Sequence, residues 1–469
     1  MGTPAEPRKI HFVSLGCAKN KVDSEVMLGV AANAGLSITN DADDAEIIVV
    51  NTCGFIGEAK RESIDTIFEL AAMKQHGKCE KLVVAGCLSQ RYSGQLADQM
   101  PEVDHFLGSS DMLKLGSVIS GDADRMMVGS PADWVIRASD PRMVTRTRAS
   151  AYVKIAEGCN RSCAFCVIPE IRGKQRSRTL EDVVREVEQL IDQGVREINV
   201  VSQDTIAWGR DLKKEDPRRL AELLAAVGDV KGLDWLRVFY LYPETMDDAL
   251  IDLYANHPKV LPYVDMPLQH ASDSMLKRMK RGHGKGRQER VVERLKKSIP
   301  DLTMRTGFIV GHPGESEADF NELVAFVEWA EFDYVGVFRY SDEETCDSHE
   351  QDEKIDAKTS YSRQRKLKSV ARTIGKKKNK ARIGQKLRVL VEGASEEHEL
   401  VMEGRHAGQA PEIDGKVFLS GGEALPGQFV DVEITQAADM DLVGEIVGVE
   451  DMPTPKKKTP KKLPMLRAT

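Results

Sequence analysis

Three cysteines within eight residues form the first candidate site. Cys159, Cys163 and Cys166 have a C-x3-C-x2-C spacing and follow a predicted strand. Three thiolates in one short loop can bind three irons of a four-iron, four-sulfur cluster, which leaves the fourth iron open for a substrate. Zinc is the main alternative. Structural zinc sites normally take four ligands from two C-x2-C knuckles, however, and the sequence has no second knuckle.

A second set of three cysteines is dispersed along the first hundred residues. Cys17, Cys53 and Cys87 each lie just past a predicted strand and beside a glycine. The carboxyl ends of parallel strands share one edge of a sheet, where ligands of open α/β sheets bind. We therefore expect the three thiols to converge on a second cluster that again has one open iron. The alternative is three buried cysteines that act as small hydrophobic residues.

The two remaining cysteines fit neither pattern. Cys79 lies between Lys78 and Glu80, so we expect it to be exposed. Cys346 lies in an acidic loop. Neither is assigned a role.

Two predicted α/β domains carry the two cysteine sets. The first of these domains covers residues 8–124 and contains the dispersed set. Strand-like and helix-like patterns alternate there, which predicts a parallel sheet covered by helices. The expected strands are 10–15, 46–50 and 81–85, and the expected helices are 22–34, 60–73 and one that starts at Ser89.

A second α/β domain is predicted at residues 145–383, after an Arg-rich connector. It contains six β-α units in about 200 residues, too few for an eight-fold barrel of about 250. The fold class is therefore α/β with a partial, open (β/α)6 barrel. Cys159 lies at the carboxyl end of its first strand, where barrel active sites are built. The expected strands are 152–156, 198–202, 236–241, 263–266, 304–310 and 334–339.

The C-terminal part changes character. Five short strands predict a small β-barrel at residues 384–450. They are expected at 387–392, 400–403, 417–420, 430–435 and 442–449. Residues 451–469 are rich in lysine and proline and are predicted to be a disordered basic tail.

Composition excludes several classes of protein. Eight cysteines in 469 residues rule out a disulfide scaffold and indicate a reducing compartment, so we expect a cytoplasmic protein. No uncharged apolar stretch is long enough to span a membrane, and residues 1–9 do not resemble a secretory signal.

Four longer motifs resemble the methylthiotransferase family of radical S-adenosylmethionine enzymes. They are LGCAKN at 15–20, NTCGFI at 51–56, IAEGCN at 155–160 and DMPLQHAS at 265–272. The resemblance covers residues 8–450 and implies an N-terminal methylthiotransferase domain, a radical core and a C-terminal TRAM barrel. It is strongest to the branch that methylthiolates the β-carbon of an aspartate in a small-subunit ribosomal protein.

The resemblance also implies the cofactors. The cluster on Cys159, Cys163 and Cys166 would bind S-adenosylmethionine at its open iron and cleave it to a radical that abstracts the substrate hydrogen. The second cluster, on the dispersed cysteines, would hold or supply the sulfur, and a second S-adenosylmethionine would supply the methyl group. Cofactors carry this chemistry because no side-chain base removes an unactivated hydrogen at neutral pH.

Residues that bind the organic cofactor are less well marked, and no catalytic acid or base is predicted. Ser202, Gln203, Asp204 and Gln269 lie at strand ends that face the cluster, where they could bind cofactor or substrate. Residues 307–315, GFIVGHPGE, include Ile309 and resemble the strand that backs the adenine in this superfamily. The spacing before the final glutamate differs from the usual one by one residue. Arg305, if buried, needs a cofactor carboxylate or an internal acid as its partner.

Charge distribution bears on the macromolecular substrate. Residues 384–450 hold fourteen acids and four Lys or Arg, a net charge of −10, which would attract a basic ribosomal protein and repel RNA. We expect the acidic loop with Glu396, Glu397 and Glu399 to take part in docking. A solvated acidic face is the alternative. Residues 363–382 hold ten Lys or Arg and no acid, and this stretch could contact ribosomal RNA.

Two other functions stay open at this point. The sister family modifies an adenosine in transfer RNA, and a two-cluster electron or sulfur carrier would need no substrate chemistry. Carriers usually saturate each cluster with four protein ligands, whereas each set here has three. The sequence identifies neither the electron donor nor the sulfur donor.

Overall fold

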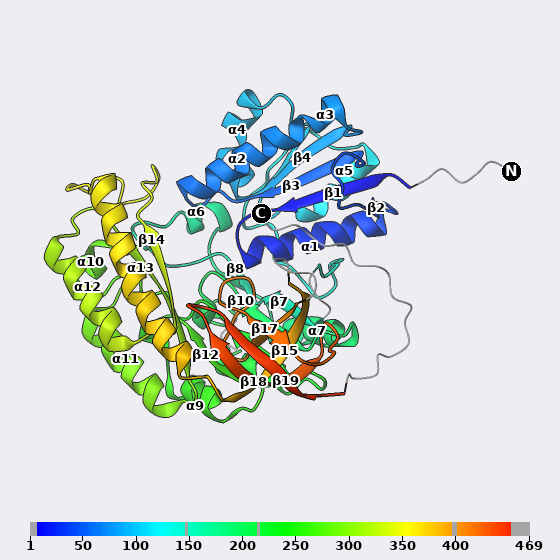
Figure 1. The fold of residues 1–469 in the computed structure, drawn as a ribbon. Helices are drawn as coiled ribbons and strands as arrows, with labels where there is room; N and C mark the ends of the chain where they lie inside the picture. Colours follow the sequence, from blue (N-terminus) through cyan, green and yellow to red (C-terminus); the bar gives the residue numbers. More distant parts are fainter. Residues whose placement is uncertain (1–6, 146–148, 213–215, 396–400, 452–469) are drawn as a thin grey trace.

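The computed structural model describes residues 7–145, 149–212, 216–395 and 401–451. The N-terminal domain is a six-stranded parallel sheet in the order β2-β1-β3-β4-β5-β6. Figure 1 shows it, in blue and cyan, above the rest of the chain. The strands are β1 (Lys9–Ser14), β2 (Ser37–Ile38), β3 (Ile47–Thr52), β4 (Lys81–Gly86), β5 (His105–Leu107) and β6 (Met126–Met127).

Helices cover both faces of this sheet, as the β-α alternation predicts. One face packs on α1 (Ala18–Asn33) and α5 (Leu115–Ser120), and the other on α2 (Gly57–Ala71) and α4 (Cys87–Gln99). A short helix, α3 (Met73–His76), follows α2. Helix α1 is buried on nearly every side because it lies between its own sheet and the second domain (Figure 1).

The second domain is the predicted open barrel. Its six strands are parallel and stand in chain order, with β7 and β14 at the two edges. They are β7 (Ser150–Lys154), β10 (Glu197–Val201), β11 (Trp235–Val238), β12 (Val260–Asp265), β13 (Thr303–Val310) and β14 (Tyr334–Arg339). A separate two-stranded ribbon is formed by β8 (Ala156–Glu157) and β9 (Arg176–Ser177).

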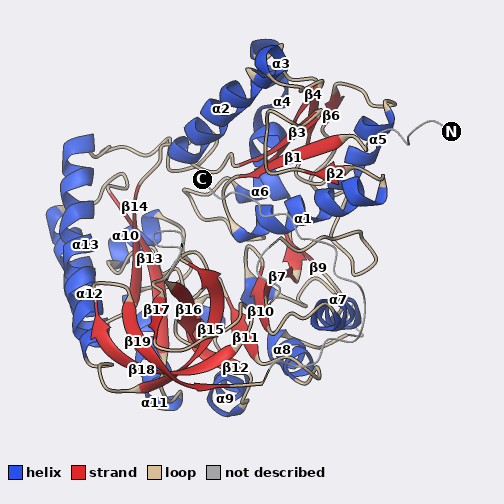
Figure 2. Ribbon diagram, turned by 45° about the vertical axis from the view of Figure 1, so that its right-hand side comes forward, coloured by secondary structure: helices blue, strands red, loops and turns tan. Residues whose placement is uncertain are grey.

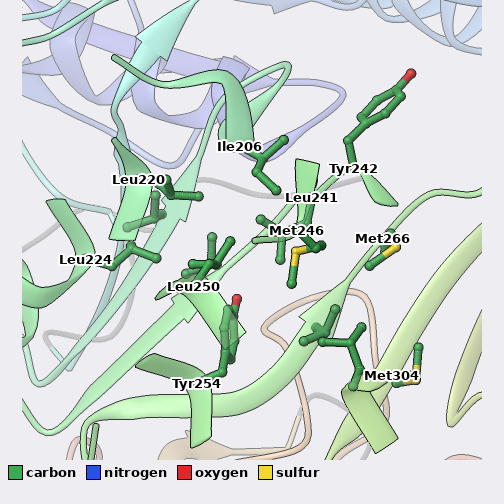
Figure 3. Close-up of a cluster of buried hydrophobic side chains, with 14 of the residues drawn as sticks. Ile206, Leu220, Leu224, Leu241, Tyr242, Met246, Leu250, Tyr254, Met266 and Met304 are labelled. Carbon is green, nitrogen blue, oxygen red and sulfur yellow. The ribbon is translucent and has the colours of Figure 1, made fainter. Parts of the chain in front are cut away.

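Helices pack on the outer face of the barrel sheet, and aliphatic side chains from strands and helices form one large core there (Figure 3). The helices are α7 (Leu180–Asp192), α8 (Leu220–Gly228), α9 (Asp248–Asn256), α10 (Asp273–Arg278), α11 (Lys285–Ser298) and α12 (Glu317–Ala330). The longest helix, α13 (Ala357–Lys380), packs on β14 and α12 and leads to the last domain (Figure 2).

The C-terminal domain is the predicted five-stranded closed barrel, ordered β15-β16-β17-β19-β18. Its strands are β15 (Lys386–Ala394), β16 (Met402–His406), β17 (Val417–Ser420), β18 (Phe429–Ala437) and β19 (Leu442–Val449). It lies against the face of the radical-domain sheet opposite the helices (Figures 1 and 2).

The end of β16 and the segment after it attach this small barrel to the sheet. Arg405 pairs with Glu197 of β10, and the guanidinium of Arg237 donates to the carbonyl oxygen of Ala407 at 2.9 Å. The Tyr263 hydroxyl donates to Asp414 at 2.6 Å. Buried ion pairs and hydrogen bonds therefore join the two domains beside an apolar cluster that includes Trp235, Leu261 and Phe429.

One expectation about a cysteine is wrong. Cys79 is only 6% exposed and packs in the core between β4 and α2, because its neighbours Lys78 and Glu80 take the solvent-facing positions. Glu396, Glu397 and Glu399 lie outside the described residues, as does the basic tail from residue 452. No helix within the described ranges is long and apolar enough to cross a membrane.

Candidate active site between two cysteine sets

The first set of cysteines lies in the loop between β8 and α6 (Ile168–Arg172), above the carboxyl end of β7. Gly158 opens the loop with φ of +79°, and a Cβ there would lie 2.2 Å from the Lys174 carbonyl oxygen, so the turn requires glycine. The Cys159 amide donates to the Gly173 carbonyl at 3.0 Å. The loop thus folds back on itself, and the three cysteines lie close together along it.

Cations and a tyrosine surround the middle cysteine of this set. The Cys163 sulfur lies 3.2 Å from the Tyr242 hydroxyl and 3.3 Å from a guanidinium nitrogen of Arg281. The guanidinium carbons of Arg281 and Arg161 lie 4.1 and 3.4 Å from the centroid of the Tyr242 ring. Figure 3 shows this ring at the border of the core, with its hydroxyl pointing away from the aliphatic side chains. Burial lowers the pKa of Arg281 to about 10.

The second set is brought together at the carboxyl edge of the N-terminal sheet, as the strand-end positions predict. Cys17 precedes α1, Cys53 follows β3, and Cys87 is the first residue of α4. Gly16 has φ of +90°, and a Cβ there would lie 2.9 Å from Cβ of Cys53 and 3.3 Å from its sulfur, so the first two strand ends touch. Burial, followed by the charges of Cys87 and Cys17, raises the pKa of Cys53 to about 12.

The donor chemistry of both sets fits iron–sulfur clusters better than a single metal ion. Among the described residues, no three Cys, His, Asp or Glu side chains converge closely enough to hold one ion. A four-iron cluster instead takes one thiolate on each of three irons, so the sulfurs stay apart. Burial raises the pKa of Cys159 to about 11 and that of Cys166 to about 12. Bound iron would supply the positive charge that such thiolates need.

A buried ionic network joins the two sets across the domain interface. Arg172, the last residue of α6, donates to the Cys87 sulfur at 3.2 Å and to Asp23 of α1 at 2.8 Å. Lys154 of β7 pairs with the same Asp23 and, at 2.6 Å, with Glu157. All four charged side chains are at most 2% exposed. The second cysteine set is thereby tied to the loop that carries the first.

Three of the predicted cofactor residues lie together beside the first cysteine loop. The Asp204 carboxylate pairs with Arg161 at 2.6 Å, and Gln203 donates to Glu157 at 2.7 Å while its own side-chain oxygen is buried without a partner in the structure. Ser202 is buried and donates to Thr205 at 3.2 Å. Asp204 and Arg161 also line a cavity of about 300 Å³.

Gln269 lies in the loop after β12, where it bridges to β13, and Ile309 lies on β13 at the same end of the barrel. Gln269 has φ of +73° and is held by two backbone hydrogen bonds, from its amide to Gly307 and from the Ile309 amide to its carbonyl, each 2.8 Å. Ile309 is aligned with Phe338 of β14, which is 51% exposed. This end of the barrel thus offers a half-buried amide beside an exposed aromatic ring.

The structure places Arg305 away from these residues. It pairs with Asp265 at 2.9 Å and with Asp414 of the C-terminal domain at 3.4 Å. Of the two expected kinds of partner, a cofactor carboxylate or an internal acid, the structure therefore shows internal acids. Glu315 is fully buried and pairs with Arg363 of α13 at 2.7 Å. Both side chains hold the barrel to its neighbours in the chain.

Sequence reasoning missed the residues that surround the cysteines. Arg172, Tyr242 and Arg281 contact a cysteine sulfur, yet they lie 85, 79 and 118 positions from it in the chain. Their spacing therefore carries no signal. The only available hint was that Arg172 follows Cys166 by six residues, within the same short segment.

Family models match all three domains. The description "Uncharacterized protein family UPF0004" matches residues 9–108, "Radical SAM superfamily" residues 153–327 and "TRAM domain" residues 383–447. These matches agree with the three domains of the structure and with the location of each cysteine set.

Similar proteins extend over nearly the whole chain. A ribosomal protein uS12 methylthiotransferase RimO of Sorangium cellulosum is 64% identical over 95% of this chain and 92% of its own length. One of the same name from Myxococcus xanthus is 45% identical over 96% of this chain and 94% of its own. Among solved structures, the radical S-adenosylmethionine methyltransferase TsrM of Kitasatospora setae aligns over 71% of this chain and 75% of its own, with TM-score 0.52 and 16% identity, which shows a shared fold.

Proposed function

This chain belongs to the ribosomal protein uS12 methylthiotransferases, and from that premise we propose that it adds a methylthio group to the β-carbon of an aspartate of uS12. The observation that carries the proposal is that two cysteine triads of different domains are linked at the domain interface, where Arg172 donates to the Cys87 sulfur and Cys87 packs with Val167, the residue after Cys166. Sulfur transfer to carbon needs both a site that generates a radical and a site that holds sulfur. We further propose that the reaction takes place in the cytoplasm, where free cysteines persist.

The two triads divide the work. Cys159, Cys163 and Cys166 hold the cluster that, when bound, supplies the electron for reductive cleavage of S-adenosylmethionine. The dispersed triad at the N-terminal sheet edge would hold a second cluster, which would hold or supply the sulfur to be transferred. Arg161 and Asp204 border the cavity beside the first triad and orient the polar groups of a bound molecule. Gln203, next to Asp204 in the chain, has a buried side-chain oxygen that accepts no hydrogen bond from any described residue.

The outer face of the small barrel is the proposed docking surface for the basic ribosomal protein. Glu433 of β18 and Glu445 of β19 are exposed and stand directly opposite each other in the antiparallel register. Like charges in that position destabilise a sheet. Lys386 of β15 stands opposite Glu433 on its other side, but Glu445 has Ser420 there, so a basic partner that lies across the pair is favoured. Val447 and Val449, 47% and 50% exposed, add apolar surface beside them. RNA would be repelled here, which favours a protein substrate over transfer RNA.

The docking surface can be tested with charge neutralisation. Glu433→Gln/Glu445→Gln should bind uS12 several-fold more weakly at low salt, with a smaller loss at high salt because the Debye length shortens. Cleavage of S-adenosylmethionine without substrate should not change. Equal affinity of variant and wild type at low salt would place docking elsewhere.

A contact with ribosomal RNA is proposed for the exposed side of α13. Lys358, Arg365, Lys368 and Lys380 are exposed on this helix, and phosphate contacts are made by such cations. Part of the basic stretch serves the fold instead, because Arg372 pairs with Asp439 and Lys377 with Glu331. Neutralising Lys358, Arg365 and Lys368 should weaken binding to ribosomal subunits but not to free uS12; unchanged subunit binding would exclude this contact.

The main experiment separates the two cysteine sets. In anaerobically reconstituted protein, Cys159→Ala/Cys163→Ala/Cys166→Ala should lose half of the iron and all cleavage of S-adenosylmethionine. Cys17→Ala/Cys53→Ala/Cys87→Ala should also lose half of the iron, keep the cleavage, and fail to add a methylthio group to uS12 by mass spectrometry. Retention of all iron by the second variant, or a wild-type chain with one cluster, would exclude the two-cluster assignment. A carrier protein would leave uS12 unmodified even in the wild type.

A further inference from the structure

We propose that Arg172 is a positioning residue of the second cluster: it fixes the Cys87 thiolate by a charge-assisted hydrogen bond and raises the reduction potential of that cluster. The inference rests on the proposed second cluster. It adds a residue of the radical domain to a site whose three cysteines all belong to the N-terminal domain.

The guanidinium of Arg172 is fixed on both sides. One terminal nitrogen donates to Asp23 at 2.8 Å and to Glu157 at 3.4 Å. The other donates to the Cys87 sulfur at 3.2 Å and to the Asn20 side-chain oxygen at 2.6 Å. The side chain is 2% exposed. A planar guanidinium held at four points has one orientation, so the direction of its bond to sulfur is set by the protein.

Asn20 extends this anchoring to the other two cysteines. Its side-chain nitrogen donates to the carbonyl oxygens of Leu15 at 3.0 Å and Thr52 at 2.8 Å. These two residues stand just before Cys17 and Cys53. Because both amide hydrogens are used there, the Asn20 oxygen must face Arg172. One buried amide thus connects two of the cysteine-bearing strand ends to the guanidinium, which contacts the third at Cys87.

The ion pairs around Arg172 do not cancel the electrostatic attraction between its guanidinium and the Cys87 thiolate. Asp23 and Glu157 are matched by two cations, Lys154 and Arg172 itself, so the network is neutral before the thiolate is counted. Arg172 stays cationic because a guanidinium is not deprotonated in proteins. A buried charge is screened little by salt.

Such a donor affects the redox equilibrium of a cluster. Reduction adds one negative charge, and hydrogen bonds to sulfur together with nearby positive charge favour the reduced form. Removal of Arg172 should therefore lower the reduction potential.

The test uses the full chain with both clusters and a matched control. Arg142 is another buried arginine that bridges the same two domains, with Glu25 of α1 at 2.6 Å and Glu186 of α7, but it contacts no cysteine in any described interaction. Arg172→Gln, Arg172→Lys and Arg142→Gln are compared by iron content and by redox titration followed by electron paramagnetic resonance. The Cys159→Ala/Cys163→Ala/Cys166→Ala background identifies the signal of the second cluster.

Arg172→Gln should shift the one-electron equilibrium of the second cluster at least tenfold toward the oxidised form, which corresponds to 59 mV. Arg172→Lys, which keeps the charge on a shorter reach, should shift it less, and Arg142→Gln should not shift it. Wild-type potentials in Arg172→Gln, or an equal shift in Arg142→Gln, overturn the proposal. If Arg172→Gln does not fold, Arg172→Lys decides, since an unchanged potential there also overturns it. A wild-type chain with a single cluster would instead refute the proposed function.

Discussion

Replacement of Glu197 by glutamine should loosen the C-terminal barrel from the radical domain. Glu197 begins β10 on the face opposite the helices, and its side chain is fully buried. It accepts hydrogen bonds from Arg405 of the small barrel at 2.5 and 3.2 Å, from Arg237 at 3.3 Å and from Ser150 at 2.8 Å. Glutamine has nearly the same shape, so the variant removes the negative charge with little change in packing. The buried guanidinium groups of Arg405 and Arg237 then lose their shared anionic partner.

The pKa of Glu197 gives the size of this effect. Burial favours the neutral acid, but Arg405 and Arg237 outweigh it and lower the pKa from 4.5 to about 2. At 1.36 kcal/mol per tenfold change in ionisation, the ion pairs stabilise the folded state by about 3 kcal/mol. Loss of one partner of a buried pair typically costs about 3–5 kcal/mol, which agrees. For a domain of this size the melting temperature should fall by roughly 6–12 °C.

The pH dependence separates this mechanism from a packing defect. Because the folded pKa is lowered, the stabilisation is fully present above the unfolded value near 4.5 and is lost as the pH falls toward 2. Wild type and Glu197→Gln should therefore differ most at neutral pH and converge in acid, as measured by thermal unfolding of both proteins in the same cluster-loaded state. Glu433→Gln, on the exposed barrel face, is the control and should stay within about 0.5 kcal/mol of wild type. A difference that does not change between pH 7 and pH 3 would refute the ionic explanation.

Two further predictions concern the cysteines. Gly16→Ala places a methyl group against Cys53 at a backbone angle that favours glycine, so reconstituted protein should lose iron from the second site while cleavage of S-adenosylmethionine continues; full iron content would contradict the close approach of these strand ends. In cluster-free protein, exposed Cys17 should react with iodoacetamide before Cys79 and Cys346, which are buried and whose pKa values burial raises to about 11; peptide mass spectrometry that finds Cys79 modified first would contradict its place in the core.

Local patterns in the sequence were sufficient for the positions of both cysteine sets. β3 is a run of buried aliphatic residues that ends at Asn51 and Thr52, so the position of Cys53 beyond the strand follows from hydrophobicity alone. The same holds for Cys17 and Cys87, since parallel pairing brings the three strand ends to one edge. The six-unit length of the second domain likewise predicted an open barrel, and the sheet is open between β7 and β14.

Contacts between domains could not be predicted in the same way. Arg305 illustrates the limit: the sequence required a partner for it but left open a cofactor carboxylate or an internal acid. The answer depends on Asp414, which reaches the barrel only because residues 407–414 insert against the inner face of the sheet. The pattern of apolar residues along the sequence does not predict such an insertion. Arg172 reaches Cys87 for a similar reason, since α6 and α4 meet only when two domains pack together.

The charge of the C-terminal domain shows how this limit affects a functional argument. Counted along the chain, residues 384–450 carry a net charge of −10. In the structure, Asp414, Asp439 and Glu450 pair with cations of the other domains or of the connecting helix, so part of that charge holds the molecule together and is not presented to a substrate. Among the acids that remain exposed, Glu433 and Glu445 stand directly opposite each other and form the pair most relevant to docking. A basic substrate should therefore be recognised by the position of a few carboxylates on one face, and neutralising these two should weaken binding more than neutralising Asp439, which already has Arg372 as its partner.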